Sequence, residues 1–204
     1  MGKHPPSVVA VSPGTLGPGQ GGAFLRALDE AAQAGLRGLL LREPGVEDGA
    51  LLELARACRA RLAEGWLALS DRVHLVAASG ADGVHLGHRS LDARLARPLL
   101  EGRTVGVSDH QDPRRDDLDL ADYATLSPFA AVPGKGPALG ADRFAELVRE
   151  RGAPTWALGG LGPDEVSAAR AAGARGVFVL RGMDWDASPG RAVERLRSAW
   201  GEGA

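Results

Sequence analysis

Residues able to do chemistry recur in this 204-residue sequence just after short apolar runs. They include three imidazoles, a hydroxyl, a carboxylate and three basic side chains: His85, His88, His110, Ser108, Asp71, Arg42, Lys135 and Arg181. An imidazole titrates near neutrality, so each histidine is suited to proton transfer. Each histidine also has a structural explanation, as a packed strand-end residue, a surface loop residue or a turn residue bonded to backbone. The basic side chains predict an anionic ligand.

Glycines mark two of these points. ALGGL ends one apolar run with Gly159 and Gly160, and VLRGM ends the next with Arg181 and Gly182. Glycine lets backbone N–H groups approach a phosphate closely, and the N-terminus of a following helix favours negative charge. We therefore expect a phosphate site here. The alternative is that Gly159 and Gly160 only relieve a tight turn.

A third glycine-rich stretch, SPFAAVPGKGPALG, spans residues 127–140. It is long for a connector and polar in its second half, which favours a mobile lid. Lys135 stands alone among glycines and prolines, where it can reach an anionic ligand. The alternative is a solvated lysine on a flexible loop.

The apolar runs predict eight strands, spaced about 20 to 30 residues apart. These are Ser7–Val11, Gly38–Arg42, Trp66–Ser70, Gly83–Leu86, Thr104–Ser108, Tyr123–Leu126, Thr155–Leu158 and Gly176–Leu180. Helical spacing of apolar residues predicts helices between them. These are Ala23–Ala34, Glu47–Ala63, Asp71–Ser79, Leu91–Leu100, Ala141–Glu150, Asp164–Ala172 and Ser188–Trp200. The segment Gln111–Ala121 is polar and short, which indicates a distorted turn or loop.

Strands alternating with helices predict an α/β protein with a parallel sheet. A closed barrel and an open doubly wound sheet both accept the pattern. Eight units in 204 residues favour a single (β/α)8 TIM barrel, and no shift in composition divides residues 1–204. In such a barrel the site lies at the C-terminal ends of the strands, with a recurrent phosphate site after strands seven and eight.

The overall charge is close to neutral, with 24 basic and 26 acidic residues and a net charge of −2. That balance argues against nucleic acid and anionic membrane as partners. Neither a long apolar run nor a signal pattern is present, which predicts a cytoplasmic location. Cys58 lies in an Ala/Leu/Arg-rich stretch and is expected as a core residue. Trp185 and Trp200 are expected as exposed apolar ends that could serve a homodimer contact.

Six motifs in the same order resemble the thiamine-phosphate synthase/TenI family of small barrels. They are LRE at 41–43, SDR at 70–72, ADGVHLGH at 81–88, GVSDH at 106–110, SPFAAVPGK at 127–135 and LGGL at 158–161. In the synthase branch, the resemblance implies that a hydroxymethylpyrimidine diphosphate ionises, with Mg²⁺ and basic groups stabilising the departing pyrophosphate. The nitrogen of a thiazole phosphate then captures the carbocation.

The resemblance also implies roles for individual residues. The family positions that hold the diphosphate and its metal correspond to Arg42, Asp71, Ser108 and Lys135. The thiazole-phosphate loop corresponds to Gly159 and Gly160. The family's second metal carboxylate falls on Ser90, so Mg²⁺ would keep only Asp71 as a protein carboxylate. Further departures are Leu40, Pro44, Ser70, His88 and Arg181.

These departures weaken the diphosphate half and leave the single-phosphate half nearly intact, which points toward the TenI side of the family. Arg181 would either clamp a phosphate or fill its pocket. A TenI-type thiazole tautomerase carries a histidine at the register of Pro128, so proton transfer would move to His85, His88 or His110. Three hypotheses therefore stay open: a synthase, a tautomerase, and a non-catalytic accessory protein that binds a small phosphorylated thiamin precursor.

Overall fold

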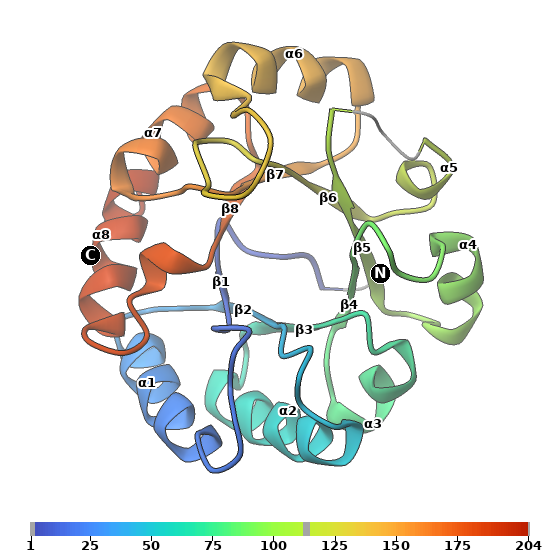
Figure 1. Ribbon diagram of the computed structural model, residues 1–204, viewed down its shortest axis with the longest axis vertical. Helices are drawn as coiled ribbons and strands as arrows, with labels where there is room; N and C mark the ends of the chain where they lie inside the picture. The colour runs from blue at the N-terminus through green and yellow to red at the C-terminus, as the bar shows by residue number, and fades with distance from the viewer. Residues whose placement is uncertain (1–2, 112–114, 204) are drawn as a thin grey trace.

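Eight parallel strands pair in chain order, and the last pairs with the first to close a barrel. The computed structural model describes residues 3–111 and 115–203. The strands are β1 Val8–Val11, β2 Gly38–Leu41, β3 Trp66–Ser70, β4 Gly83–Leu86, β5 Thr104–Asp109, β6 Tyr123–Leu126, β7 Thr155–Leu158 and β8 Gly176–Val179. Figure 1 shows the barrel end-on inside a ring of helices. The predicted TIM barrel is confirmed.

Five long helices form most of the outer ring: α1 Gly21–Gln33, α2 Asp48–Leu62, α6 Gly140–Arg151, α7 Pro163–Ala171 and α8 Pro189–Trp200. Each buries an apolar stripe against the outside of the strands, as amphipathic helices do. Their bounds lie close to those expected from the spacing of apolar residues.

The other helices are shorter than the sequence predicted. α3 (Val76–Ser79) and α4 (Ala93–Ala96) are single turns, each continuous with a 3₁₀ turn. Pro98 shortens α4, since proline lacks the N–H that an α-helix needs. Asp71 has a φ of 64°, which keeps the start of its segment out of the helix. Of Gln111–Ala121, residues 112–114 lie outside the described residues, and α5 (Arg115–Leu118) is one turn.

The inside of the barrel is filled by aromatic rings that face glycines. Tyr123, Trp66, Phe178 and Trp156 form one cluster with buried aliphatic residues from β1, β2 and β3. A Cβ at Gly106 would lie 2.0 Å from the Tyr123 ring. The missing side chain is therefore what makes room for the tyrosine, and large and small residues together pack the interior.

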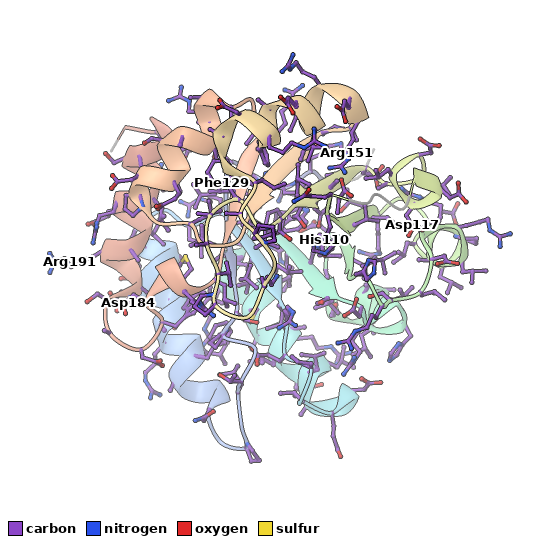
Figure 2. All side chains as sticks on the ribbon, turned by 45° about the horizontal axis from the view of Figure 1, so that its top comes forward. His110, Asp117, Phe129, Arg151, Asp184 and Arg191 are labelled. Carbon is purple, nitrogen blue, oxygen red and sulfur yellow. The ribbon has the colours of Figure 1, made fainter. Side chains whose placement is uncertain are left out.

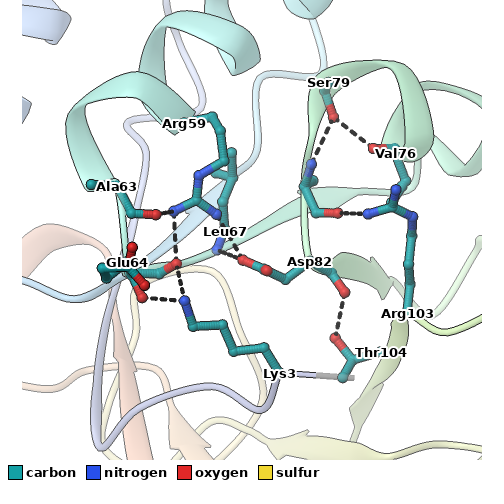
Figure 3. Close-up of polar contacts among 12 residues, drawn as sticks. Lys3, Arg59, Ala63, Glu64, Leu67, Val76, Ser79, Asp82, Arg103 and Thr104 are labelled. Carbon is teal, nitrogen blue, oxygen red and sulfur yellow. Dashed lines mark hydrogen bonds and ion pairs between the residues drawn. The ribbon is translucent and has the colours of Figure 1, made fainter. Parts of the chain in front are cut away.

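A polar network ties together the starts of β3, β4 and β5, at the end of the barrel opposite the loops that follow the strands (Figure 3). Asp82 accepts hydrogen bonds from Arg59 Nη1 and from the backbone N–H of Leu67, both at 2.8 Å. The Thr104 hydroxyl donates to the carbonyl of Asp82 at 3.2 Å. Residues at this end of a TIM barrel serve stability, and these bonds fix where the strands begin.

The expected exposure of two tryptophans is wrong. Trp185 is half-buried: its ring meets Phe24 at 5.1 Å between centroids, and its Nε1–H donates to the Val11 carbonyl at 2.8 Å. Trp200 is also half-buried against the core, beneath Arg170. Both side chains therefore pack against the core of this chain. Cys58 is fully buried, as expected.

No helix among the described residues has the length and apolar character needed to cross a membrane.

Candidate active site at the C-terminal ends of the strands

The loops that follow β2 and β3 line a small hollow that is partly open to solvent. Its lining combines two guanidinium groups with hydroxyl and carboxylate groups, from Arg42, Glu43, Pro44, Leu51, Ser70, Asp71 and Arg72. Arg42 and Asp71, which the sequence predicted as site residues, therefore share one cavity. The mixture of two cations with carboxylates suits a phosphate chain with or without a metal ion.

Arg42 is placed by its neighbour in the LRE motif. Glu43 is buried, and its two carboxylate oxygens accept hydrogen bonds from the backbone N–H groups of Gly14 and Leu16, at 2.8 and 2.9 Å. The backbone N–H of Arg42 donates to Ser12 Oγ at 2.8 Å. These bonds fix the loop between β1 and α1 beside the exposed Arg42 side chain.

Asp71 adopts the left-handed backbone region, which is uncommon for a residue other than glycine. Its Oδ1 accepts hydrogen bonds from the Gly87 N–H, at 2.9 Å, and from the Ser90 hydroxyl. The Ser70 hydroxyl donates to Oδ2 at 3.2 Å. A strained backbone that is held by several bonds is typical of functional positions, and here it turns the carboxylate toward the loop after β4.

The donor set around Asp71 tests the expected magnesium site. Within residues 3–111 and 115–203, no group of three histidines, cysteines or carboxylates is arranged to hold a metal ion. Ser90 presents a hydroxyl that donates to Asp71, where a second carboxylate would have served as a ligand. Mg²⁺ is commonly bound by one or two carboxylates together with substrate phosphates and water. The residues present therefore fit only a magnesium ion that reaches Asp71 together with a phosphorylated substrate.

His85 lies inside the barrel, at the boundary between the aromatic core and the open end formed by the C-terminal ends of the strands, which we call the mouth. Its Nδ1 is 3.2 Å from the Tyr123 hydroxyl, and its Nε2 is 3.0 Å from Ser108 Oγ and 3.3 Å from Thr125 Oγ1. Burial lowers the pKa of His85 from its ordinary value of 6.5 to about 4. The expectation that this ring titrates near neutrality is therefore wrong, and the imidazole is neutral at pH 7. Ser108, by contrast, is only half-buried.

His88 and His110 face each other at the mouth, with ring centroids 5.7 Å apart. His110 Nδ1 lies 3.0 Å from the carbonyl of Ser127, and its backbone N–H donates to Asp109 at 2.8 Å. In Figure 2, His110 lies between the labelled Phe129 and Asp117. The structure thus places two of the predicted imidazoles together, and it holds one of them against the first residue of the loop after β6.

An ion pair below His110 supports this side of the site. Arg151 Nη1 lies 2.7 Å from Asp109 Oδ2, and both side chains are almost fully buried. The same guanidinium donates to the carbonyl of His110 at 2.5 Å. Burial raises the pKa of Asp109, and the charge of Arg151 opposes that rise. α6 thereby holds the end of β5 in place.

The glycine loop after β7 has a backbone conformation that requires glycine. Gly159 and Gly160 both have positive φ angles, 97° and 71°. A Cβ on Gly160 would lie 2.8 Å from the Ala130 backbone, so only glycine fits there. Among the described residues, no backbone carbonyl accepts a hydrogen bond from the N–H of Gly160 or from the N–H of Leu161. These two N–H groups precede α7 and are available to an anion.

The turn after β8 completes this half of the site. Arg181 and Gly182 begin a 3₁₀ turn that ends at Met183. A Cβ on Gly182 would lie 2.6 Å from the carbonyl of Leu161, so the two loops lie against each other. The side chain of Arg181 is exposed. The four residues predicted for the phosphate are therefore brought together by β7 and β8.

The loop 127–140 is anchored at both ends and exposed between them. The N–H groups of Phe129 and Ala130 donate to the carbonyls of Leu158 and Gly159, at 2.9 and 3.0 Å. The N–H of Leu139 donates back to Pro128 at 3.0 Å. Lys135 is exposed at the far side of the loop. Figure 1 shows this loop, in yellow, next to the ends of β7 and β8.

Sequence reasoning missed Tyr123 and Thr125. Each is a polar residue that is buried within or just after an apolar run. Alternation along β6 was the available signal, because Tyr123 and Thr125 are two residues apart and so face the same side of the sheet. The register of β5 and β6 pairs Ser108 with Thr125, which no local pattern reveals.

Comparison with known proteins gives one consistent result. A family model described as thiamine monophosphate synthase matches residues 8–183. A Geobacter sulfurreducens protein, provisionally assigned as a thiamine-phosphate synthase, is 40% identical over 186 residues, covering 86% of this chain and 87% of the relative. The thiamine-phosphate synthase of Azorhizobium caulinodans is 33% identical over 168 residues, covering 78% and 79%. A thiamine phosphate pyrophosphorylase from Pyrococcus furiosus has the same fold, with a TM-score of 0.82, 20% identity and 96% of each chain covered.

Proposed function

Because the chain belongs to the thiamine monophosphate synthase family, we propose that it couples hydroxymethylpyrimidine diphosphate with thiazole phosphate and releases pyrophosphate. The observation that carries this proposal is that basic side chains and backbone N–H donors gather on two separate sides of the barrel mouth. Arg42 and Asp71 line the hollow after β2 and β3. Gly160 and Arg181 follow β7 and β8, and these strands lie on another side of the barrel from β2 and β3 (Figure 1). A reaction that joins two phosphorylated molecules needs a separate binding site for each of them.

In this proposal the hollow binds the diphosphate. Arg42 and the Ser108 hydroxyl stabilise the negative charge that grows on the departing pyrophosphate, which is the usual role of fixed cations and donors around a transition state. A magnesium ion held by Asp71 and the diphosphate would supply further positive charge. The resemblance to the family assigns Lys135, on the exposed loop after β6, to the same anion.

The opposite half binds the thiazole phosphate. The N–H groups of Gly160 and Leu161 donate to the phosphate oxygens, with the positive end of α7 beneath them. Arg181 adds a bidentate contact from the neighbouring turn. These contacts hold the thiazole ring over the barrel centre, where proximity to the pyrimidine carbocation replaces a chance encounter.

The test is turnover of the two substrates with Mg²⁺, followed by oxidation of the product to a fluorescent thiochrome. Formation of thiamine phosphate in proportion to enzyme supports the synthase. Binding of thiazole phosphate in calorimetry without any turnover overturns it in favour of the non-catalytic accessory protein. Isomerisation of a thiazole carboxylate phosphate without coupling overturns it in favour of the tautomerase.

A pair of glycine variants tests the thiazole-phosphate half separately. Gly160→Ala brings a methyl group to 2.8 Å from the Ala130 backbone, whereas Gly134→Ala, at a similar φ of 78°, has open space around it. We expect Gly160→Ala to raise the KM for thiazole phosphate at least tenfold, since a lost charge-assisted hydrogen bond is worth roughly 1.5–3 kcal/mol. Gly134→Ala controls for backbone strain alone. Equal KM values in the two variants would contradict the assignment of this loop.

A further inference from the structure

The buried hydroxyl of Tyr123 has one polar neighbour among the described residues, the imidazole of His85. The phenol ring is held on all sides: it stacks on Phe178 with centroids 5.9 Å apart and meets Trp156 edge-on at 5.6 Å. It lies over Gly106, where any side chain would collide with it. Such enclosure fixes the direction of the hydroxyl, and its direction is toward His85 Nδ1.

Three hydroxyls face the two nitrogens of this ring. Tyr123 is at Nδ1, while Ser108 and Thr125 are both at Nε2. A neutral imidazole has one N–H donor and one lone pair. The phenol, with its lower pKa, is a far stronger hydrogen-bond donor than the alkyl alcohols of Ser108 and Thr125. The lone pair of the ring is therefore expected at Nδ1, facing the phenol.

We propose that Tyr123 is a positioning residue: its hydroxyl holds His85 in the tautomer whose Nε2–H donates to Ser108. Ser108 Oγ then accepts from the ring, and its own proton points away from His85. Ser108 is half-buried whereas Tyr123 and His85 are buried, so that proton is directed to the mouth. It donates to a phosphate oxygen of the diphosphate substrate, and in this step the inference rests on the proposed function.

The opposite tautomer would reverse the role of Ser108. With the proton on Nδ1, the bare Nε2 would attract the hydroxyl proton of Ser108 inward. Only oxygen lone pairs would then face the mouth, and an anionic oxygen would be repelled. A single proton position inside the barrel thus decides whether the mouth presents a donor or an acceptor to the substrate.

Long-range ¹H–¹⁵N correlation spectra of histidine-labelled protein read the tautomer directly. The signals of His85 are identified by their loss in His85→Gln. We expect the Nε2–H tautomer in the wild type, and loss of this preference in Tyr123→Phe, which keeps the ring and removes the hydroxyl. An Nδ1–H tautomer in the wild type, or an unchanged Nε2–H tautomer in Tyr123→Phe, overturns the proposal.

A double-mutant cycle tests whether Tyr123 acts through Ser108. We expect Tyr123→Phe to lower kcat/KM for the diphosphate substrate about tenfold or more, because one donor to the developing anion is lost. In the background of Ser108→Ala, the same change should have less than a twofold effect. A full effect in both backgrounds overturns the proposal, since a purely structural role of Tyr123 would be independent of Ser108.

Thr155→Val is the matched control. It also removes a buried hydroxyl, one that donates to the Ala153 carbonyl at 2.8 Å at the start of β7. We expect it to lower stability without changing kcat/KM or the tautomer of His85. If the wild type does not couple the two substrates, the proposed function fails. The same cycle is then measured as the Kd of inorganic pyrophosphate, with the same expected pattern and the same overturning result.

Discussion

Acidification should destabilise this protein through one buried imidazole. His85 has a pKa of about 4 in the folded chain, because burial disfavours its charged form, against 6.5 when it is solvated. Between these values the unfolded chain binds a proton at this residue and the folded chain does not. The free energy of unfolding therefore falls as the pH falls from 6.5 toward 4.

The magnitude follows from the two pKa values. A difference between 6.5 and about 4 corresponds to about 3 kcal/mol when complete, since one pKa unit is worth about 1.4 kcal/mol. At pH 5 this residue should lower the free energy of unfolding by about 2 kcal/mol relative to pH 7.5. Well above pH 6.5 the imidazole is neutral in both states and contributes no pH dependence.

Urea unfolding followed by tryptophan fluorescence, at pH 7.5 and pH 5 in buffer with EDTA, measures the effect. Carboxylates also titrate in this range, so the quantity that matters is the difference between the wild type and His85→Gln. We expect the wild type to lose about 2 kcal/mol more than this variant. His4→Gln, at an exposed position, should behave as the wild type. The same loss in the wild type and His85→Gln would refute the account of His85 as a buried neutral ring.

Three further outcomes follow from buried groups. Burial raises the pKa of the Cys58 thiol to about 12, so a thiol reagent at pH 8 should label it only after urea is added; rapid labelling of native protein would contradict this. Arg151→Met leaves the buried carboxylate of Asp109 without the cation 2.7 Å away, and urea unfolding should show a loss of roughly 3 kcal/mol or more. Gly106→Ala would place a methyl group 2.0 Å from the Tyr123 ring, so a melting temperature equal to that of the wild type would argue against this packing.

The sequence predicted the barrel because its strands are short apolar runs with polar residues at their ends. The same rule located Arg42, Asp71 and Ser108, since the C-terminal ends of parallel strands meet at one mouth. Gly159 and Gly160 were also predictable, because a tight turn with positive φ angles requires glycine. Local chemistry determined these features, so local patterns revealed them.

Contacts between distant residues were beyond the reach of these patterns. The bond between His85 and Tyr123 joins residues 38 positions apart, and the ion pair of Asp109 with Arg151 joins a strand end to a helix end. Burial, which sets the pKa of His85, depends on how eight strands pack together. The titration of that ring was therefore mispredicted although its position in the barrel was anticipated as a packed strand end.

The interior of the barrel changes character along the strands, and this change connects stability with activity. Near the strand starts the space is filled by rings such as Trp66 and Tyr123, whose burial drives folding. One step closer to the mouth, β5 and β6 place hydroxyls side by side at Ser108 and Thr125. His85 lies between these layers and bonds to both. The core of this barrel therefore does more than support the loops: through one imidazole, a ring packed for stability determines which atom the mouth offers to an anion.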